Sequence, residues 1–324
     1  MSFSKNIDML ELPPELEYDI LKLVVDTTPG QAFKLCMVSR YVQEWMEAIM
    51  YKTVLLNWPG AKAELFMRTF DTRPACFFAE KVKHLIIKGK APDDVSFFSQ
   101  TVKVIEACAG ANDITCWLLP NSSNGVNLVH AISRPNLNRL SITFDALSNI
   151  DGSGERMKFT PEMFPHLTHL EIAYPNYNIL DAHSGVDIDW PSIATLPSLS
   201  HLVVGELYGR DNATFAASMR HILDNCPNLK ILILVADSLH LRAALVACGV
   251  CEFAKVMLFG LNQSLLPGYW EGIMRGQPGY WEIADCYLDP SLSKSMRDEK
   301  VRCLMRWISR LRMVFRWRAC CRPL

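Results

Sequence analysis

The chain has 324 residues, enough for about two domains. Half of the residues are hydrophobic and 21% are charged, a balance that provides a packed core and excludes a disordered chain. The 33 lysines and arginines nearly balance the 34 aspartates and glutamates, so overall charge predicts no nucleic-acid partner. Residues 294–324 differ, because they carry ten basic side chains against only Asp298 and Glu299.

Cysteine usage and hydropathy indicate the compartment. The eleven cysteines follow no regular spacing, and residues 1–14 contain no apolar signal-peptide segment. We therefore expect reduced thiols and a cytoplasmic or nuclear protein. The most apolar stretch, residues 231–236, is far shorter than the roughly 18 to 20 residues of a membrane-spanning helix.

The first region, residues 8–58, has the pattern of short helices. Pro13 and Pro14 stand where a helix can begin, and acidic Glu15 follows in its first turn. The apolar residues of this helix share one face: Leu16, Ile20, Leu21 and Val24. Residues 27–30 end it, and two further helical patterns follow. Three short helices form only a small core, so a partner that covers an apolar face would stabilise them.

Five short phrases in this region occur in the order typical of an F-box: LPPEL at 12–16, IL at 20–21, VSR at 38–40, Trp45, and YKTV at 51–54. Residues 8–58 thus resemble the F-box of fungal F-box proteins. The resemblance implies three helices that bind a Skp-type adaptor of a cullin-RING ubiquitin ligase. The adaptor-binding residues that it implies are Leu12, Pro13, Leu16, Ile20, Leu21, Val38, Ser39 and Trp45. Leu12, Pro13 and residues 38–39 are expected to face the adaptor, whereas Leu16 and Ile20 are expected to point inward.

The second region, residues 59–261, repeats a phrase of the form LxxLxI. Four copies place a leucine at steps of 30, 32 and 30 residues: Leu140, Leu170, Leu202 and Leu232. This period is typical of solenoid proteins. The copies predict strands near residues 82–87, 114–118, 137–142, 167–172, 199–204, 229–234 and 253–258. In each strand, alternate residues such as Leu170 and Ile172 should point into one core.

Segments with helical spacing, such as residues 215–223, fall between the predicted strands. Neither a strand nor a helix of this kind buries its apolar face without neighbours. The region resembles irregular leucine-rich repeats, and an ordinary α/β domain with coincidental spacing is the alternative. The expected fold class is therefore α/β, with a three-helix F-box followed by a leucine-rich-repeat-like solenoid of strands and helices.

Two shorter segments complete the chain. Residues 262–299 form a closing segment, in which residues 281–285 begin a helical pattern and resemble the W-x-x-A-(D/E) phrase that closes many fungal F-box and repeat proteins. Residues 300–324 are expected to form a basic amphipathic tail, with apolar side chains on one side of a helix and arginines, including Arg316, on the other. Such a helix caps the repeats or, alternatively, binds an acidic membrane surface or a calmodulin-like groove.

Candidate chemistry is sparse. The chain contains none of the common nucleophile, phosphate-loop, dinucleotide or zinc-protease motifs. Cys248 and Cys251 form a single CxxC, and a structural zinc site needs four ligands. His166 and His169 lie three apart at a strand entry and need not share a face, so we expect them to be hydrogen-bonded or exposed. We expect no catalytic residues, no metal and no cofactor.

The resemblance to F-box proteins with leucine-rich repeats implies a substrate-recognition subunit of an SCF-type cullin-RING ubiquitin ligase. Its F-box would bind the Skp-type adaptor, and its repeats would bind an unknown target protein. One alternative is an F-box scaffold that does not direct degradation. Another is an enzyme of unrecognised class whose fold only imitates repeats.

Overall fold

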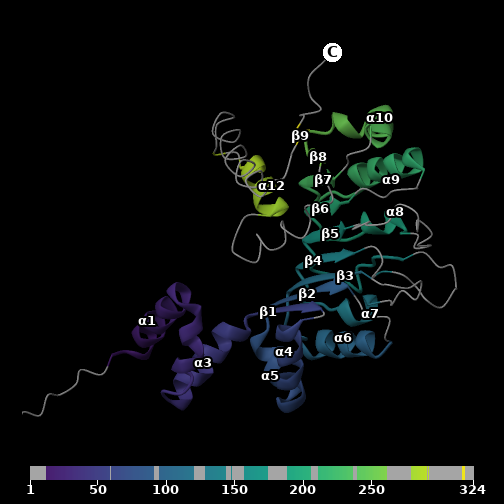
Figure 1. The fold of residues 1–324 in the computed structure, drawn as a ribbon. Coiled ribbons are helices and arrows are strands. Elements are labelled where there is room, and N and C mark those ends of the chain that lie inside the picture. Colours follow the sequence, from purple (N-terminus) through teal and green to yellow (C-terminus); the bar gives the residue numbers. More distant parts are fainter. Residues whose placement is uncertain are drawn as a thin grey trace, which may run out of the picture.

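The computed structural model describes residues 12–58, 60–90, 95–119, 128–143, 147, 157–173, 188–205, 211–235, 239–260, 279–289, 291 and 316–317. The predicted α/β class is confirmed: helices at the N-terminus precede a large, mainly parallel sheet (Figure 1). Among the described residues, no helix is long and apolar enough to cross a membrane.

The N-terminal part consists of three helices and a short 3-10 turn. They are α1 (Pro14–Thr27), η1 (Pro29–Gln31), α2 (Ala32–Leu35) and α3 (Arg40–Tyr51). The helices enclose a small core of their own: Val25, Ala32, Val42 and Met46. In Figure 1 these helices project from the β1 end of the sheet.

Within the described residues the sheet has nine strands, and each is hydrogen-bonded to the next described strand along the chain. The strands are β1 (Thr53–Trp58), β2 (His84–Lys90), β3 (Asp113–Leu119), β4 (Arg139–Thr143), β5 (His169–Ala173), β6 (His201–Val204), β7 (Ile231–Val235), β8 (Val256–Gly260) and β9 (Arg316–Trp317). Strands β1 to β8 are parallel. The strands that the repeated phrase predicts are therefore confirmed.

The register confirms the repeat spacing. Leu140, Leu170, Leu202 and Leu232 are direct partners across four neighbouring strands, and all are buried. Alternate strand residues point to the same face, so these leucines and the residues two positions later enter one core. Leu170 and Ile172 are both buried in it, as the sequence predicts.

Helices cover this apolar face. They are α4 (Ala61–Thr72), α5 (Ala75–Lys81), α6 (Val95–Ala107), α7 (Val129–Ile132), α8 (Trp190–Ile193), α9 (Asn212–Asn225) and α10 (Leu239–Ala247), followed by the 3-10 turn η4 (Val250–Glu252). Figure 1 shows α6 to α10 along one side of the sheet and α12 (Tyr280–Leu288) on the other. The helical patterns predicted at residues 215–223 and 281–285 are confirmed as parts of α9 and α12.

The described residues between β4 and β5 contain no α-helix, and residues 144–146 and 148–156 of this connection lie outside the described part. One expectation needs correction. Arg316 was expected on the polar face of a helix, but Arg316 and Trp317 form β9, which pairs antiparallel with β8. Backbone pairing with the last parallel strand competes with the helix there. Residues 300–315 and 318–324 lie outside the described part, and so do residues 261–278.

Candidate functional site

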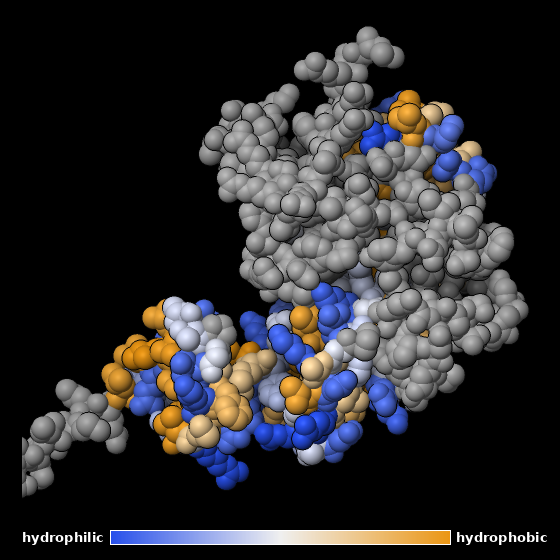
Figure 2. Space-filling model, in the orientation of Figure 1, coloured by the Kyte–Doolittle hydropathy of each residue, from blue (hydrophilic) through white to orange (hydrophobic). Residues whose placement is uncertain are grey.

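An exposed apolar surface covers the N-terminal helices. Nine large hydrophobic side chains in residues 12–41 are between 37 and 72% exposed. We call them the N-terminal apolar surface: Leu12, Leu16, Ile20, Leu23, Val24, Phe33, Met37, Val38 and Tyr41. Figure 2 shows apolar residues gathered over the region of these helices. Such a concentration of exposed apolar side chains is typical of a protein interaction site.

Helix α1 presents apolar residues on two faces. Leu21 and Val25 pack in the core of the N-terminal helices. Leu16 and Ile20 lie four residues apart on another face of the helix, and Leu12 immediately precedes its N-cap residue Pro13. The expected inward position of Leu16 and Ile20 is therefore wrong, because both side chains are about half exposed. Leu21 and Val25 already occupy the inner face.

The remaining predicted contact residues divide into exposed and structural ones. Pro13 and Val38 are exposed. Ser39 instead caps α3, since its Oγ accepts a hydrogen bond from the Val42 N–H at 3.3 Å. In the VSR phrase, Val38 is thus an exposed apolar residue and Ser39 is the N-cap of α3.

Trp45 holds α3 against α1. Its half-buried ring packs edge-on against Tyr18 and Tyr41, with ring centroids 5.7 and 5.0 Å away. The hydroxyl of Tyr41 donates a hydrogen bond to Glu17 Oε2 at 3.1 Å. Trp45 therefore packs α3 against α1, a structural role in addition to the adaptor contact that the F-box resemblance implies.

Helix α3 also connects the N-terminal helices to the sheet. The carboxylate of Glu47 is nearly buried and accepts hydrogen bonds from Gln43 Nε2 at 2.9 Å and Arg73 Nη2 at 2.6 Å. Farther along α3, the ring of Tyr51 packs edge-on against Phe77, with centroids 5.0 Å apart. These contacts fix the direction in which α3 leaves the sheet.

A second group of functional side chains lies on the sheet face opposite α6 to α10. The first residues of four neighbouring strands are direct partners: Asp113, Arg139, His169 and His201. They alternate with the buried leucines and so point away from the main core. The polar row ends at His201, because its partner in β7 is the apolar residue Ile231.

Helix α12 packs across this row. His201 Nε2 lies 3.0 Å from Asp285 Oδ1. The guanidinium of Arg139 stands 5.7 Å from the centroid of the Trp281 ring, and its Nη1 lies 3.8 Å from Glu282 Oε1. The 281–285 phrase thus supplies the contacts between α12 and the sheet.

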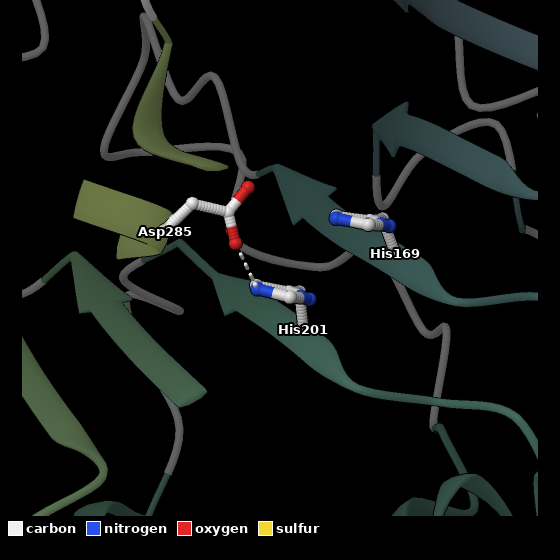
Figure 3. Close-up of side chains that lie close together, drawn as sticks. All are labelled: His169, His201 and Asp285. Carbon is white, nitrogen blue, oxygen red and sulfur yellow. Dashed lines mark hydrogen bonds and ion pairs between the residues drawn. The ribbon is translucent and has the colours of Figure 1, made fainter. Parts of the chain in front are cut away.

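The rings of His169 and His201 are stacked, with centroids 4.2 Å apart and planes 4° from parallel (Figure 3). His169 Nδ1 lies 2.8 Å from Thr168 Oγ1, which donates to the Asn138 carbonyl at 2.9 Å. Likewise, His201 Nδ1 lies 2.9 Å from Ser200 Oγ, which is also 3.0 Å from the Thr168 carbonyl oxygen. For His201, the carboxylate of Asp285 can only accept, so the ring hydrogen lies on Nε2 and Nδ1 accepts from the Ser200 hydroxyl.

The surroundings keep both rings uncharged. Burial, together with the neighbouring His201, Arg139 and Lys230, lowers the pKa of His169 to about 3. Burial also lowers the pKa of His201, although the adjacent Asp285 carboxylate opposes this effect. The Nε2 of His169 is buried and has no hydrogen-bond partner within the described part of the chain. His169 is thus hydrogen-bonded through Nδ1, as expected, whereas its Nε2 has no partner among the described residues.

A buried carboxyl group lies two residues farther along β5. Glu171 Oε2 accepts a hydrogen bond from Ser141 Oγ at 2.8 Å, and Ser141 Oγ accepts one from Trp117 Nε1 at 2.7 Å. Burial raises the pKa of Glu171 to about 7, and the nearby Glu282 adds to this rise, while the Ser141 hydrogen bond opposes it. Burial thus favours the protonated form of Glu171.

Among the residues that the structure describes, His169, His201 and Asp285 form the group able to hold a metal ion, with donor atoms within 4.8 Å of one another. Cys248 and Cys251 are half-buried and pack against the sheet core. The sequence reasoning missed His201 and Asp285 as partners. The signal available was the dipeptide of a hydroxyl residue and histidine, Thr168-His169 and Ser200-His201, immediately before the core leucine of two consecutive copies.

The chain was compared with known proteins. No protein-family model matches it, and no curated protein shows significant sequence similarity to it.

Proposed function

We propose that the chain is a substrate-recognition subunit of an SCF-type cullin-RING ubiquitin ligase, working in the cytoplasm or nucleus. In this proposal residues 8–58 are an F-box that binds the Skp-type adaptor. The parallel sheet and its helices are an irregular leucine-rich-repeat solenoid that binds a target protein. The chain itself contributes no catalytic residue and no cofactor.

The N-terminal apolar surface is the observation that carries the proposal. An isolated protein gains nothing from nine exposed large apolar side chains on about thirty residues, whereas a partner that covers them removes apolar area from water. Four of the residues that the F-box resemblance assigns to the adaptor contribute to this surface: Leu12, Leu16, Ile20 and Val38. The apolar stripe of α1 fits recognition in which a helix lies in a hydrophobic groove.

The connection between the two parts also supports the proposal. Glu47 and Arg73 join α3 to the segment between α4 and α5, and Tyr51 packs on Phe77. A receptor must hold its target at a defined distance from the enzyme that carries ubiquitin. A short and packed junction limits the orientations of the target relative to the adaptor, and so raises its effective concentration there.

The sheet offers surfaces for a target. Stacked units form a long rigid frame, and the connecting segments at its rim can differ without disturbing the core. The polar row beginning at Asp113 and ending at His201 gives one face hydrogen-bonding groups as well as apolar area. Part of that row is packed against α12.

Copurification with a Skp-type adaptor tests the first half of the proposal. We expect the full-length chain to retain the adaptor, and the double variant Leu16→Ala with Ile20→Ala to lose at least about tenfold in affinity, because both side chains are exposed anchors. The variant Leu12→Ala with Pro13→Ala should act in the same direction.

A matched control uses Leu239→Ala with Val246→Ala on α10, whose side chains are 78 and 59% exposed outside the N-terminal apolar surface. This control should bind the adaptor as the unaltered chain does. Failure of the unaltered chain to bind any Skp-type adaptor would sink the proposal. Equal losses of adaptor affinity in the control and the α1 variant would show that non-specific hydrophobic association, not the N-terminal apolar surface, governs binding.

A cellular measurement tests the second half. If the chain directs degradation, proteins captured by the sheet region should become longer-lived and less ubiquitinated when the Leu16→Ala, Ile20→Ala variant replaces the unaltered chain. Unchanged lifetimes, with adaptor binding lost, would instead establish a scaffold that does not direct degradation.

A further inference from the structure

We propose that His169, His201 and Asp285 form a binding site for a divalent transition metal, best suited to Zn²⁺, that fastens α12 to strands β5 and β6. The site does not depend on the proposed adaptor interaction, because it lies on the other side of the sheet from α6 to α10 and far from α1 in the fold (Figure 1).

The donor atoms are of the kind that zinc binds. Two neutral imidazoles and one carboxylate are a donor set that zinc uses when water or another ligand occupies its fourth position. The Nδ1 atoms lie next to the hydroxyls of Thr168 and Ser200, which could accept the Nδ1 hydrogens when both Nε2 atoms bind a metal. Metal-bound histidines in proteins are typically fixed in this way, through a hydrogen bond made by the ring nitrogen that does not bind the metal.

One contact at the site lacks a partner and another can be replaced by a metal. The buried Nε2 of His169 has no hydrogen-bond partner among the described residues, so a metal ion would supply one. The Nε2 of His201 donates to Asp285 Oδ1 at 3.0 Å. A metal ion bound by both groups would take the place of this hydrogen, which the neutral His201 ring would then carry on Nδ1. Figure 3 shows the stacked rings each with a nitrogen toward the Asp285 side.

A bound metal would require a small rearrangement. Tetrahedral zinc with bonds of about 2.0 to 2.1 Å keeps its donors roughly 3.3 Å apart, whereas the three donors here lie within 4.8 Å of one another. The lone pairs lie in the ring planes, so the parallel rings must tilt toward each other. The Asp285 side chain is 58% exposed and can follow without disturbing the core.

Neighbouring charges come close to balance. Arg139 and Lys230 are near enough to the histidines to oppose a cation. Glu282 lies 3.8 Å from Arg139 and offsets it, and Asp285 supplies a negative charge to the metal directly. The metal would join residues 84 positions apart in the chain. It would thereby close a long loop and hold α12 on the sheet.

A Co²⁺ titration of the full-length chain, after treatment with a chelator, tests the proposal. Co²⁺ occupies zinc sites and reports its coordination through visible absorption. We expect one Co²⁺ bound per chain, with the spectrum of a low-coordinate nitrogen and oxygen site, and its displacement by Zn²⁺. Asp285→Asn and His169→Ala should each lower the affinity for Co²⁺ by at least about 100-fold.

His240→Ala is the matched control, because His240 is exposed on α10 and outside the site. It should bind Co²⁺ as the unaltered chain does. The same metal should raise the midpoint of thermal unfolding of the unaltered chain but not of Asp285→Asn, since a ligand that binds only the folded state stabilises it. Asp285 is exposed enough for this variant to fold. Binding that survives Asp285→Asn and His169→Ala, or no Co²⁺ binding by the unaltered chain, overturns the proposal.

Discussion

The N-terminal helices and the sheet bury their apolar residues in opposite ways. The described part of the sheet has one continuous core that extends from Val54 on β1 to Leu258 on β8. Helices α1 to α3 share a core of only four fully buried side chains, while nine large apolar ones remain exposed. The sheet and its helices therefore bury most of their large apolar side chains within one core of their own. The N-terminal helices depend on their junction with the sheet and, in our proposal, on a partner.

The largest contrast should come from the same substitution in the two parts. Phe78 is fully buried and its ring contacts those of Phe66 and Phe70, with centroids 5.5 and 5.3 Å away. Phe78→Ala should lower the free energy of unfolding by about 3 to 5 kcal/mol through lost burial and a cavity. Phe33→Ala, at a 71% exposed position on α2, should change it by less than about 0.5 kcal/mol.

Denaturation in urea measures both changes. For adaptor binding the order is the opposite: Phe33→Ala should weaken it more than Phe78→Ala does. A large loss of stability in Phe33→Ala would mean that the side chain is covered within the chain, and the contrast between the two parts would fail.

A smaller effect should follow from removing Arg134, a buried cation inside the sheet part. Its guanidinium donates hydrogen bonds to the carbonyls of Ile105, Cys108 and Ala131, at 2.7 to 2.9 Å. These carbonyls lie at the ends of α6 and α7, where helical carbonyls lack partners within the helix, and that of Cys108 also accepts from the Ala111 N–H at 2.9 Å. We expect Arg134→Ala to cost about 3 kcal/mol by urea denaturation.

Arg220→Ala provides the comparison for Arg134. Arg220 forms an exposed pair with Asp224 one turn along α9, and such pairs contribute about 0.3 to 0.5 kcal/mol. Its guanidinium also stands 4.7 Å from the centroid of the Phe253 ring, a contact worth about 0.5 to 1 kcal/mol at an exposed site, so we expect a total loss of about 1 kcal/mol. Equal effects of the two variants would show that the buried carbonyls find other partners when Arg134 is absent.

The leucine ladder shows how far the sequence predicts this fold. Leu140, Leu170, Leu202 and Leu232 repeat at a nearly constant step because each is a direct partner of the next in a parallel sheet. Local spacing therefore predicts the strands, their order and their buried face. The start of α1 at Pro14 is also predicted by local sequence, because the first N–H group of a helix has no partner within the helix and proline lacks that group.

Contacts between distant residues could not be predicted in this way. Arg134 reaches carbonyls up to 29 positions away, and Asp285 meets His201 across 84 positions. Both depend on how neighbouring units stack, which no local pattern encodes. The faces of α1 were ambiguous for a different reason. Because apolar residues occupy two sides of it, spacing alone does not decide whether Leu16 or Leu21 points inward.

Thiol labelling under native conditions should sharpen the comparison further. Cys36 is half-buried beside the small core of the N-terminal helices, and burial raises its pKa. Cys116 is fully buried in β3, where burial raises the pKa to about 12. Opening of a small unit costs less free energy than opening of the sheet, so Cys36 should be alkylated at least about 100-fold faster than Cys116.

Mass spectrometry of the digested protein follows each thiol separately. Cys76 on α5 is exposed and should react first, which provides the reference rate. Binding of an adaptor should slow the labelling of Cys36 and leave Cys116 unchanged. Equal rates for Cys36 and Cys116 would indicate that the helices and the sheet open together.

The smallest expected effect concerns the junction itself. Arg73 Nη2 lies 2.6 Å from Glu47 Oε1, but the Arg73 side chain is 40% exposed, so solvent screens the pair. Arg73→Ala should lower the free energy of unfolding by up to about 1 kcal/mol, and less at high salt. Arg73→Lys keeps the charge but not the planar guanidinium donor, so its free energy of unfolding should lie between those of the unaltered chain and Arg73→Ala. Urea denaturation at low and high salt measures these differences. A loss of several kcal/mol would show that one ion pair couples the two parts into a single folding unit, and the division drawn between them would then have to be abandoned.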